Sequence, residues 1–161
     1  MALEWPFPME SAHPLVVHFP IALLSAAVLL DLLALALKRP AWHRVALWNL
    51  CLGTVGAAAA VLTGLRAAEV AKHTFAIHQV MELHQKLGIT TLIIGSVVAV
   101  WRLAARDRLG PPSRTLSMLL MAAMVGTLAS GAHLGGRLVY EFGVGGAFGG
   151  AAHQAAPDHH H

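Results

Sequence analysis

Four long apolar stretches, separated by shorter polar or charged segments, dominate the pattern of hydrophobic positions. They cover approximately residues 14–37, 45–65, 84–103 and 116–134. Each meets the length of roughly 17–25 residues that a transmembrane α-helix needs. The pattern therefore predicts an all-α integral membrane protein, in which short loops join four transmembrane helices into an antiparallel bundle.

Two segments outside these spans follow a different pattern. Residues 67–86 mix charged and histidine side chains with apolar ones, which predicts an amphipathic outer segment that runs helically into the third span. Residues 143–161 are rich in Gly and Ala and end in three histidines, which we set aside because a purification tag leaves the same residues. We therefore expect one membrane domain, residues 1–142, and a flexible tail.

Composition excludes most soluble functions. Hydrophobic residues make up 57% of the 161-residue chain and charged residues 12%, against about 45–50% and about 25% in an average soluble domain. A soluble enzyme, a nucleic-acid-binding domain and a disordered chain are all poor interpretations. The single cysteine, Cys51, excludes a disulfide framework, a four-thiolate zinc site and covalent haem attachment through a CxxCH motif.

The distribution of charge predicts the orientation. Seven of the eleven Lys and Arg residues lie in the loops at 38–44 and 102–114, and six of the eight acidic residues lie on the opposite side. The positive-inside rule then places both loops in the cytoplasm and both termini outside. Asp31 is the one acid deep in a span. It either relays protons or pairs with Arg44 or Arg102 at the cytoplasmic surface, and we favour the pair because no second acid continues a path.

Histidines are frequent for a chain of this size, and six of the eleven lie on the predicted outer half: His13, His18, His73, His78, His84 and His133. A rise of about 1.5 Å per residue puts His18, His84 and His133 ~30, ~27 and ~28 Å from the inner charges, with His13 ~7 Å higher. Three imidazoles thus reach one depth, where a polar side chain is costly unless it faces the bundle interior with a partner. His43, next to Arg44 in an inner loop, is set aside.

The candidate ligands of a shared metal or haem site are therefore His18, His84, His133 and His13. Because His13 and His18 point ~140° apart on a regular helix, we do not expect them to bind the same iron, which leaves room for two haems. Taken singly, each histidine has a simpler interpretation. His18, for example, could bond the carbonyl that Pro20 leaves unpaired.

Small residues lie beside these histidines and would make space for a flat cofactor. They are Gly88 and Gly95 on the His84 face of the third span, and Gly126 and Ser130 on the His133 face of the fourth. A further stripe on the second span comprises Gly53, Gly56, Ala60 and Gly64. Taken alone, such stripes are more typical of close helix packing of the small-xxx-small type.

Three motifs carry a resemblance to a known family. Residues 13–23 read HPLVVHFPIAL, which resembles the HPxxVHFPIAL signature of a bacterial membrane family catalogued as domain of unknown function 2231. Residues 84–88, HQKLG, are similar to its HxxLG motif, and residues 131–140, GAHLGGRLVY, to its closing motif. Phe142 stands where many members have a histidine, whereas others have tryptophan in place of His133. The chain therefore resembles the histidine-rich branch, over about residues 13–145.

The resemblance implies an electron-transfer setting at the outer face of the bacterial inner membrane, because relatives are sometimes fused to periplasmic c-type cytochrome domains. Together with the histidines, it favours a membrane b-type cytochrome that holds one or two haem b groups and relays electrons between a periplasmic redox carrier and a membrane partner or quinone. The alternatives are a copper or zinc protein that uses the same histidines, and a cofactor-free scaffold subunit. The sequence shows no nucleophile–base pair, so we do not expect a catalytic activity of its own. The oligomeric state is left open, a homo-oligomer included.

Overall fold

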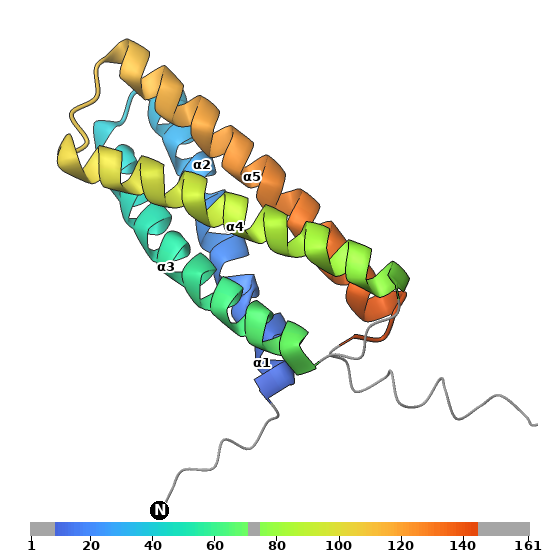
Figure 1. The fold of residues 1–161 in the computed structure, drawn as a ribbon. Helices are drawn as coiled ribbons and strands as arrows, with labels where there is room; N and C mark the ends of the chain where they lie inside the picture. Colours follow the sequence, from blue (N-terminus) through green and yellow to red (C-terminus); the bar gives the residue numbers. More distant parts are fainter. Residues whose placement is uncertain (1–8, 71–74, 145–161) are drawn as a thin grey trace, which may run out of the picture.

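The computed structural model describes residues 9–70 and 75–144. In these residues the chain forms five α-helices and no strand: α1 (Met9–Val16), α2 (His18–Ala36), α3 (Pro40–Val70), α4 (Phe75–Ala104) and α5 (Pro111–Tyr140). A turn at Val17 separates α1 from α2. The long helices lie beside one another in a single elongated bundle (Figure 1). The predicted all-α architecture is confirmed.

Four stretches of helix are long and apolar enough to cross a membrane: His13–Ala36, Pro40–Glu69, Phe75–Ala104 and Pro111–Tyr140. They contain the four apolar stretches identified in the sequence, apart from the loop residue Leu37. α4 begins at Phe75, so this part of the amphipathic segment 67–86 is one helix with the third span. Residues 71–74, His73 included, and the tail from residue 145 onwards lie outside the described residues.

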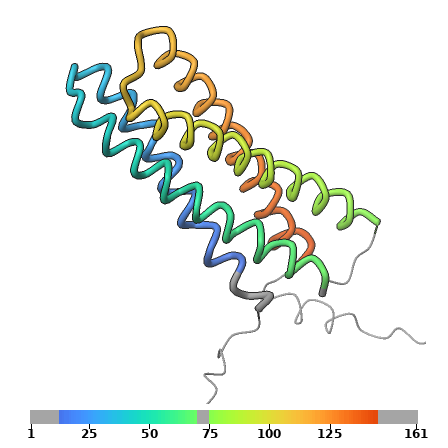
Figure 2. The backbone as a smooth tube through the Cα atoms, turned by 60° about the vertical axis from the view of Figure 1, so that its left-hand side comes forward, coloured from blue at the N-terminus to red at the C-terminus, as the bar shows by residue number. Residues whose placement is uncertain are grey.

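The bundle has two chemically different ends. The connections α2–α3 and α4–α5 lie at one end, and α1, the end of α3 and the end of α5 lie at the other (Figures 1 and 2). Consecutive helices pack against each other, α2 on α3, α3 on α4 and α4 on α5. The end with the two connections carries the basic loops, which the positive-inside rule predicts to face the cytoplasm. We call it the inner end and the opposite one the outer end.

α2 and α4 terminate in the same way at the inner end. Lys38 and Arg106 adopt positive φ angles of 51° and 50°. This conformation lets the N–H of Arg39 reach the carbonyl of Ala34 at 2.9 Å, and the N–H of Asp107 reach that of Arg102 at 2.7 Å. Both are Schellman-type caps, in which a basic residue takes the left-handed position that usually belongs to glycine.

A buried ionic network ties the inner end together. Asp31 and Arg102 are 1% and 0% exposed, and the guanidinium of Arg102 donates hydrogen bonds to both carboxylate oxygens of Asp31. Arg102 also donates to the carbonyl of His43 at 3.1 Å and to Asp107 Oδ1 at 3.0 Å. The Nδ1 of His43 lies 2.7 Å from Asp31 Oδ1. The expected pair with Arg102 is confirmed, but it is buried between α2, α3 and α4 instead of lying at the surface, while Arg44 is exposed.

The apolar core fills the middle of the bundle. Leu24, Leu50, Val98 and Met124, one from each long helix, are completely buried. α2 packs so closely on α3 that a Cβ added at Gly53 would lie 2.7 Å from Leu24 Cδ2. At Gly56 on α3 an added Cβ would meet the ring of Phe19 at 2.7 Å. The close-packing interpretation of the small stripe on the second span is therefore confirmed at these glycines.

Candidate cofactor-binding cavity

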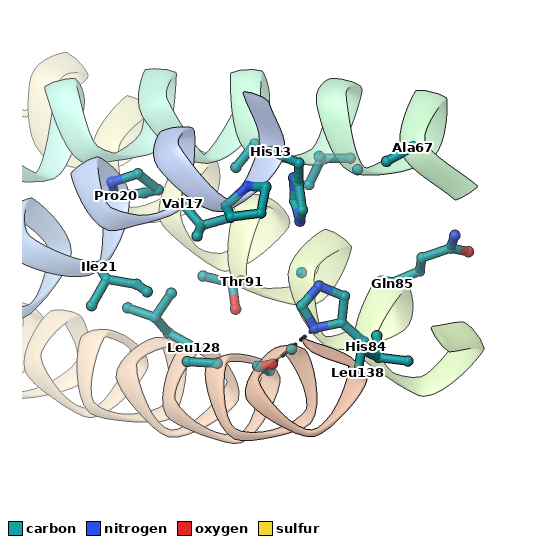
Figure 3. Close-up of a pocket in the computed structure, with 18 of the residues that line it drawn as sticks. His13, Val17, Pro20, Ile21, Ala67, His84, Gln85, Thr91, Leu128 and Leu138 are labelled. Atoms are coloured by element: carbon teal, nitrogen blue, oxygen red, sulfur yellow. Dashed lines mark hydrogen bonds between the residues drawn. The ribbon is translucent and has the colours of Figure 1, made fainter. Parts of the chain in front are cut away.

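Two histidines from different helices face each other at the outer end. His13 belongs to α1 and His84 to α4, and they approach from opposite sides of a cavity (Figure 3). Their ring centroids are 6.0 Å apart and their ring planes are inclined at 83°. The structure thus brings the start of the first predicted span close to the start of the third.

Each imidazole is oriented by a hydrogen bond at Nδ1. His13 Nδ1 lies 3.1 Å from Thr63 Oγ1, and the Thr63 hydroxyl donates its own proton to the carbonyls of Ala59 and Ala60. The oxygen of Thr63 therefore acts as the acceptor for His13. His84 Nδ1 lies 2.8 Å from the carbonyl of Gly131, which can only accept. Both bonds place the proton on Nδ1 and leave the lone pair of Nε2 available, the arrangement in which histidines bind metals.

Glycines on the neighbouring helices make room for both rings. A Cβ added at Gly64 of α3 would lie 2.9 Å from Cε1 of His13. A Cβ added at Gly135 of α5 would lie 3.1 Å from Cε1 of His84, whereas one at the adjacent Gly136 would meet no atom within 4 Å. Each imidazole therefore packs directly on a helix backbone, and a larger residue at Gly64 or Gly135 would push it from its position.

The cavity between the two rings has a volume of about 360 Å³, within the range of ligand sites. Its described lining comes from all five helices and holds no Asp, Glu, Lys or Arg. Thr91 and Thr127 are bonded to each other through their hydroxyls at 2.9 Å, so they add no unpaired polar group. Gln85 also lines the cavity (Figure 3). The walls otherwise consist mainly of apolar and small residues, which suits a large, flat, apolar ligand.

Four of the eight residues predicted to form the site line this cavity: His13, His18, His84 and Gly88. His18 is exposed, and its Nδ1 lies 2.6 Å from the carbonyl of Pro14. It therefore bonds a different carbonyl from the one that Pro20 leaves unpaired. His13, expected about one turn above the other histidines, is the residue whose ring reaches His84.

The other four predicted residues lie elsewhere. Gly95 packs against Thr54 and Met124 deeper in the bundle, and a Cβ at Gly126 would meet nothing within 4 Å. Ser130 and His133 are exposed and line a second hollow between α4 and α5. The predicted set is thus divided between a cavity inside the bundle and a hollow on its surface. The two facing rings are held by Thr63, Gly131 and Gly135, which are not among the eight predicted residues.

The donor set limits what the site can bind. Within residues 9–70 and 75–144, no three His, Cys, Asp or Glu side chains come together as a metal site. Zinc sites use three or four protein ligands, whereas two imidazoles are the complete axial set of a six-coordinate haem. The pair of His13 and His84 matches the second requirement.

These features define a helical membrane protein with four candidate spans and a half-buried histidine pair. The chain belongs to the family described as predicted membrane protein (DUF2231), whose model matches residues 10–147. No curated protein and no solved structure matches it. The family expected from residues 13–23 is confirmed, and its histidine-rich branch stays a prediction. The match includes the whole of α2 to α5, both facing histidines and both glycines behind them.

Proposed function

We propose that the protein is a b-type cytochrome of the bacterial inner membrane that holds haem b between His13 and His84. The spacing of the two rings carries the proposal. A metal–imidazole bond is about 2 Å long and the ring centre lies about 1 Å beyond the nitrogen, so two axial imidazoles place their ring centres roughly 6 Å apart. The separation of 6.0 Å agrees with this value. Perpendicular ring planes are compatible with it, because each ring can turn about its own metal–nitrogen bond.

The surrounding residues would serve such a group in distinct ways. Thr63 and the Gly131 carbonyl fix both rings with Nε2 directed to the cavity. Gly64 and Gly135 let the rings pack directly on the helix backbones, and the apolar walls would exclude water. Haem held by His13 and His84 would supply reversible one-electron transfer.

The position of the cavity suggests the partners. It lies at the outer end, opposite the basic loops, and this distribution of charge supports a position near the periplasmic face. We therefore expect an electron relay between a periplasmic cytochrome or similar carrier and a partner within the membrane, a quinone being the simplest. No activity of its own on a substrate is needed for this role.

An absorption spectrum of the full chain, purified in detergent after expression with ample haem, tests the proposal. We expect a Soret band, narrow α and β bands on reduction, and one haem per chain. His13→Ala and His84→Ala should each abolish this low-spin spectrum, and added imidazole should restore part of it if the protein stays folded. His18→Ala and His133→Ala should retain it. A flat spectrum of the unaltered chain would refute haem binding and direct attention to copper and zinc analysis. Loss of colour only in His18→Ala and His133→Ala would refute His13 and His84 as the ligands.

Two glycines of α5 provide a matched test of the ligand geometry. Gly135→Ala adds a methyl group 3.1 Å from the ring of His84, and Gly126→Ala adds the same group to open space at a residue that does not line the cavity. Changes to groups that support a ligand typically cost about 10–100-fold in metal affinity. We expect Gly135→Ala to release haem to an apo-globin acceptor at least about tenfold faster, with Gly126→Ala unchanged. Equal rates in both variants would contradict a role of His84 in holding the haem.

A further inference from the structure

A second hollow lies on the surface of the bundle, between α4 and α5. Its volume is about 450 Å³, and it is lined by Leu83, Leu87, Ala129, Ser130, His133 and Leu134. It is more open than the histidine cavity and faces away from the bundle interior, where lipid would surround it. Its lining is apolar except for one imidazole and one hydroxyl.

His133 is the unexplained group in this hollow. It is exposed and, among the described residues, has no hydrogen-bond partner. The Ser130 hydroxyl donates to the carbonyl of Gly126 at 2.9 Å, which leaves only its acceptor capacity free. A polar side chain at membrane depth is costly and usually has a partner. The hollow therefore offers a hydrogen-bond donor inside an apolar rim that lipid-soluble molecules can reach.

The hollow and the histidine cavity share a wall that is one helix thick. On α4, His84 and Gly88 line the cavity, while Leu83 and Leu87 line the hollow. On α5, residues 131 and 132 line the cavity and residues 129, 130 and 133 line the hollow. The same turns of both helices thus present one face to each site, and Gly131, two residues from His133, also accepts the hydrogen bond of His84.

We propose that this hollow binds the headgroup of a membrane quinone, with His133 donating a hydrogen bond to one quinone carbonyl. A quinone combines a flat ring that carries two carbonyl acceptors with an isoprenoid tail, which matches a single donor set among leucines and alanine. A lipid acyl chain would leave the imidazole without a partner. The quinone would be the membrane-side electron partner of the cytochrome proposed above, so its role rests on that proposed function. Quinone binding itself can be measured without haem.

Photolabelling of the full chain in lipid nanodiscs tests the site. The probe is an azido-quinone with a short isoprenoid tail, and the control probe carries the same tail and azide without the quinone ring. We expect the quinone probe to label α4 or α5 at the hollow, to saturate, and to be displaced by unlabelled quinone. His133→Phe, which keeps an aromatic ring without the N–H, should weaken half-maximal labelling roughly fivefold, the effect of one lost hydrogen bond.

A filling variant and its matched control keep the test decisive. Ala129→Leu should abolish labelling because it fills the hollow, while Ala123→Leu, on the exposed face of α5 away from the hollow, should not. Equal labelling by the ring-less probe, or labelling that neither His133→Phe nor Ala129→Leu reduces, would overturn the quinone site. The absorption spectrum separates the two proposals. Specific labelling of a colourless protein supports the quinone site and refutes haem binding. A haem-bearing protein without specific labelling supports haem binding and refutes the quinone site.

Discussion

Removal of the carboxylate of Asp31 should cost the protein a large part of its stability. The buried network at the inner end contains two acids and two arginines, namely Asp31, Asp107, Arg102 and Arg114, joined by the ion pairs already described and by a 3.0 Å bond from Arg114 to Asp107. The two negative and two positive charges of this network balance. Asp31→Asn leaves Arg102, which is 0% exposed, with one net uncompensated positive charge around it.

The expected loss is about 3 kcal/mol of unfolding free energy. Breaking a buried pair typically costs about 3–5 kcal/mol, and the remaining bond from Arg102 to Asp107 at 3.0 Å favours the lower value. Replacing both members, Asp31→Leu with Arg102→Met, removes the buried charges together. The double variant should therefore lie within about 1 kcal/mol of the unaltered protein, or above it.

Reversible unfolding in mixed detergent micelles, followed by far-ultraviolet circular dichroism, measures these values. The single variants Asp31→Leu and Arg102→Met complete a double-mutant cycle with the double variant. Arg108→Met is the control, because Arg108 is an exposed arginine in the loop that follows α4. Its effect should stay within about 0.5 kcal/mol. A loss below about 1 kcal/mol for Asp31→Asn, or a double variant less stable than either single variant, would refute the view that uncompensated charge dominates.

Two further predictions follow from the packing and the charge distribution. Gly53→Ala places a methyl group 2.7 Å from Leu24 and should destabilise the protein by about 1–3 kcal/mol, while Gly126→Ala, which meets nothing within 4 Å, should be neutral in the same unfolding assay. In a variant without the native cysteine, Tyr140→Cys should react with a membrane-impermeant maleimide added to intact cells, and Arg108→Cys only after lysis. The opposite labelling pattern would reverse the predicted orientation.

The depth of each residue along its helix could be predicted from the sequence, and much of the fold follows from these depths. The apolar lengths predict the four spans, and the depth of Asp31 predicts a pair with Arg44 or Arg102, of which Arg102 is the partner in the structure. A rise of about 1.5 Å per residue is the same in every helix, so depth follows from counting. The close packing at Gly53 was also predictable from its stripe, since small residues are needed wherever two backbones approach.

The direction in which each side chain points could not be predicted in this way. Lipid is as apolar as the core, so a helix in a membrane needs no polar outer face, and its sequence does not reveal which side is buried. This explains why His133 was grouped with His84, although one faces outward and the other faces the cavity. Val17 keeps helical backbone angles and its N–H reaches the carbonyl of His13 at 3.1 Å, so α1 runs on into α2. The spacing of five residues then turns His13 and His18 to different sides of this helix, but it does not tell which of the two faces His84.

His43 was missed for a related reason. The sequence places it in a charged loop, but α3 begins at Pro40, so His43 lies in the first turn of a helix. Its Nδ1 is 2.7 Å from Asp31 Oδ1. A proline at the first helical position was the signal that could have identified this turn, because proline favours that place.

The contrast between the two ends explains how a small bundle can keep a cavity inside a membrane. Helices gain little from apolar burial against one another when lipid is the alternative, so specific contacts must hold them. At the inner end, Asp31 and Arg102 supply such contacts between α2, α3 and α4, and every carboxylate oxygen of Asp31 has a partner. At the outer end the nearest polar contacts hold His13 and His84 to neighbouring helices, yet no hydrogen bond joins the two rings across the cavity. A paired inner end therefore fixes the helices, whereas at the outer end the proposed haem would supply the missing contact between His13 and His84.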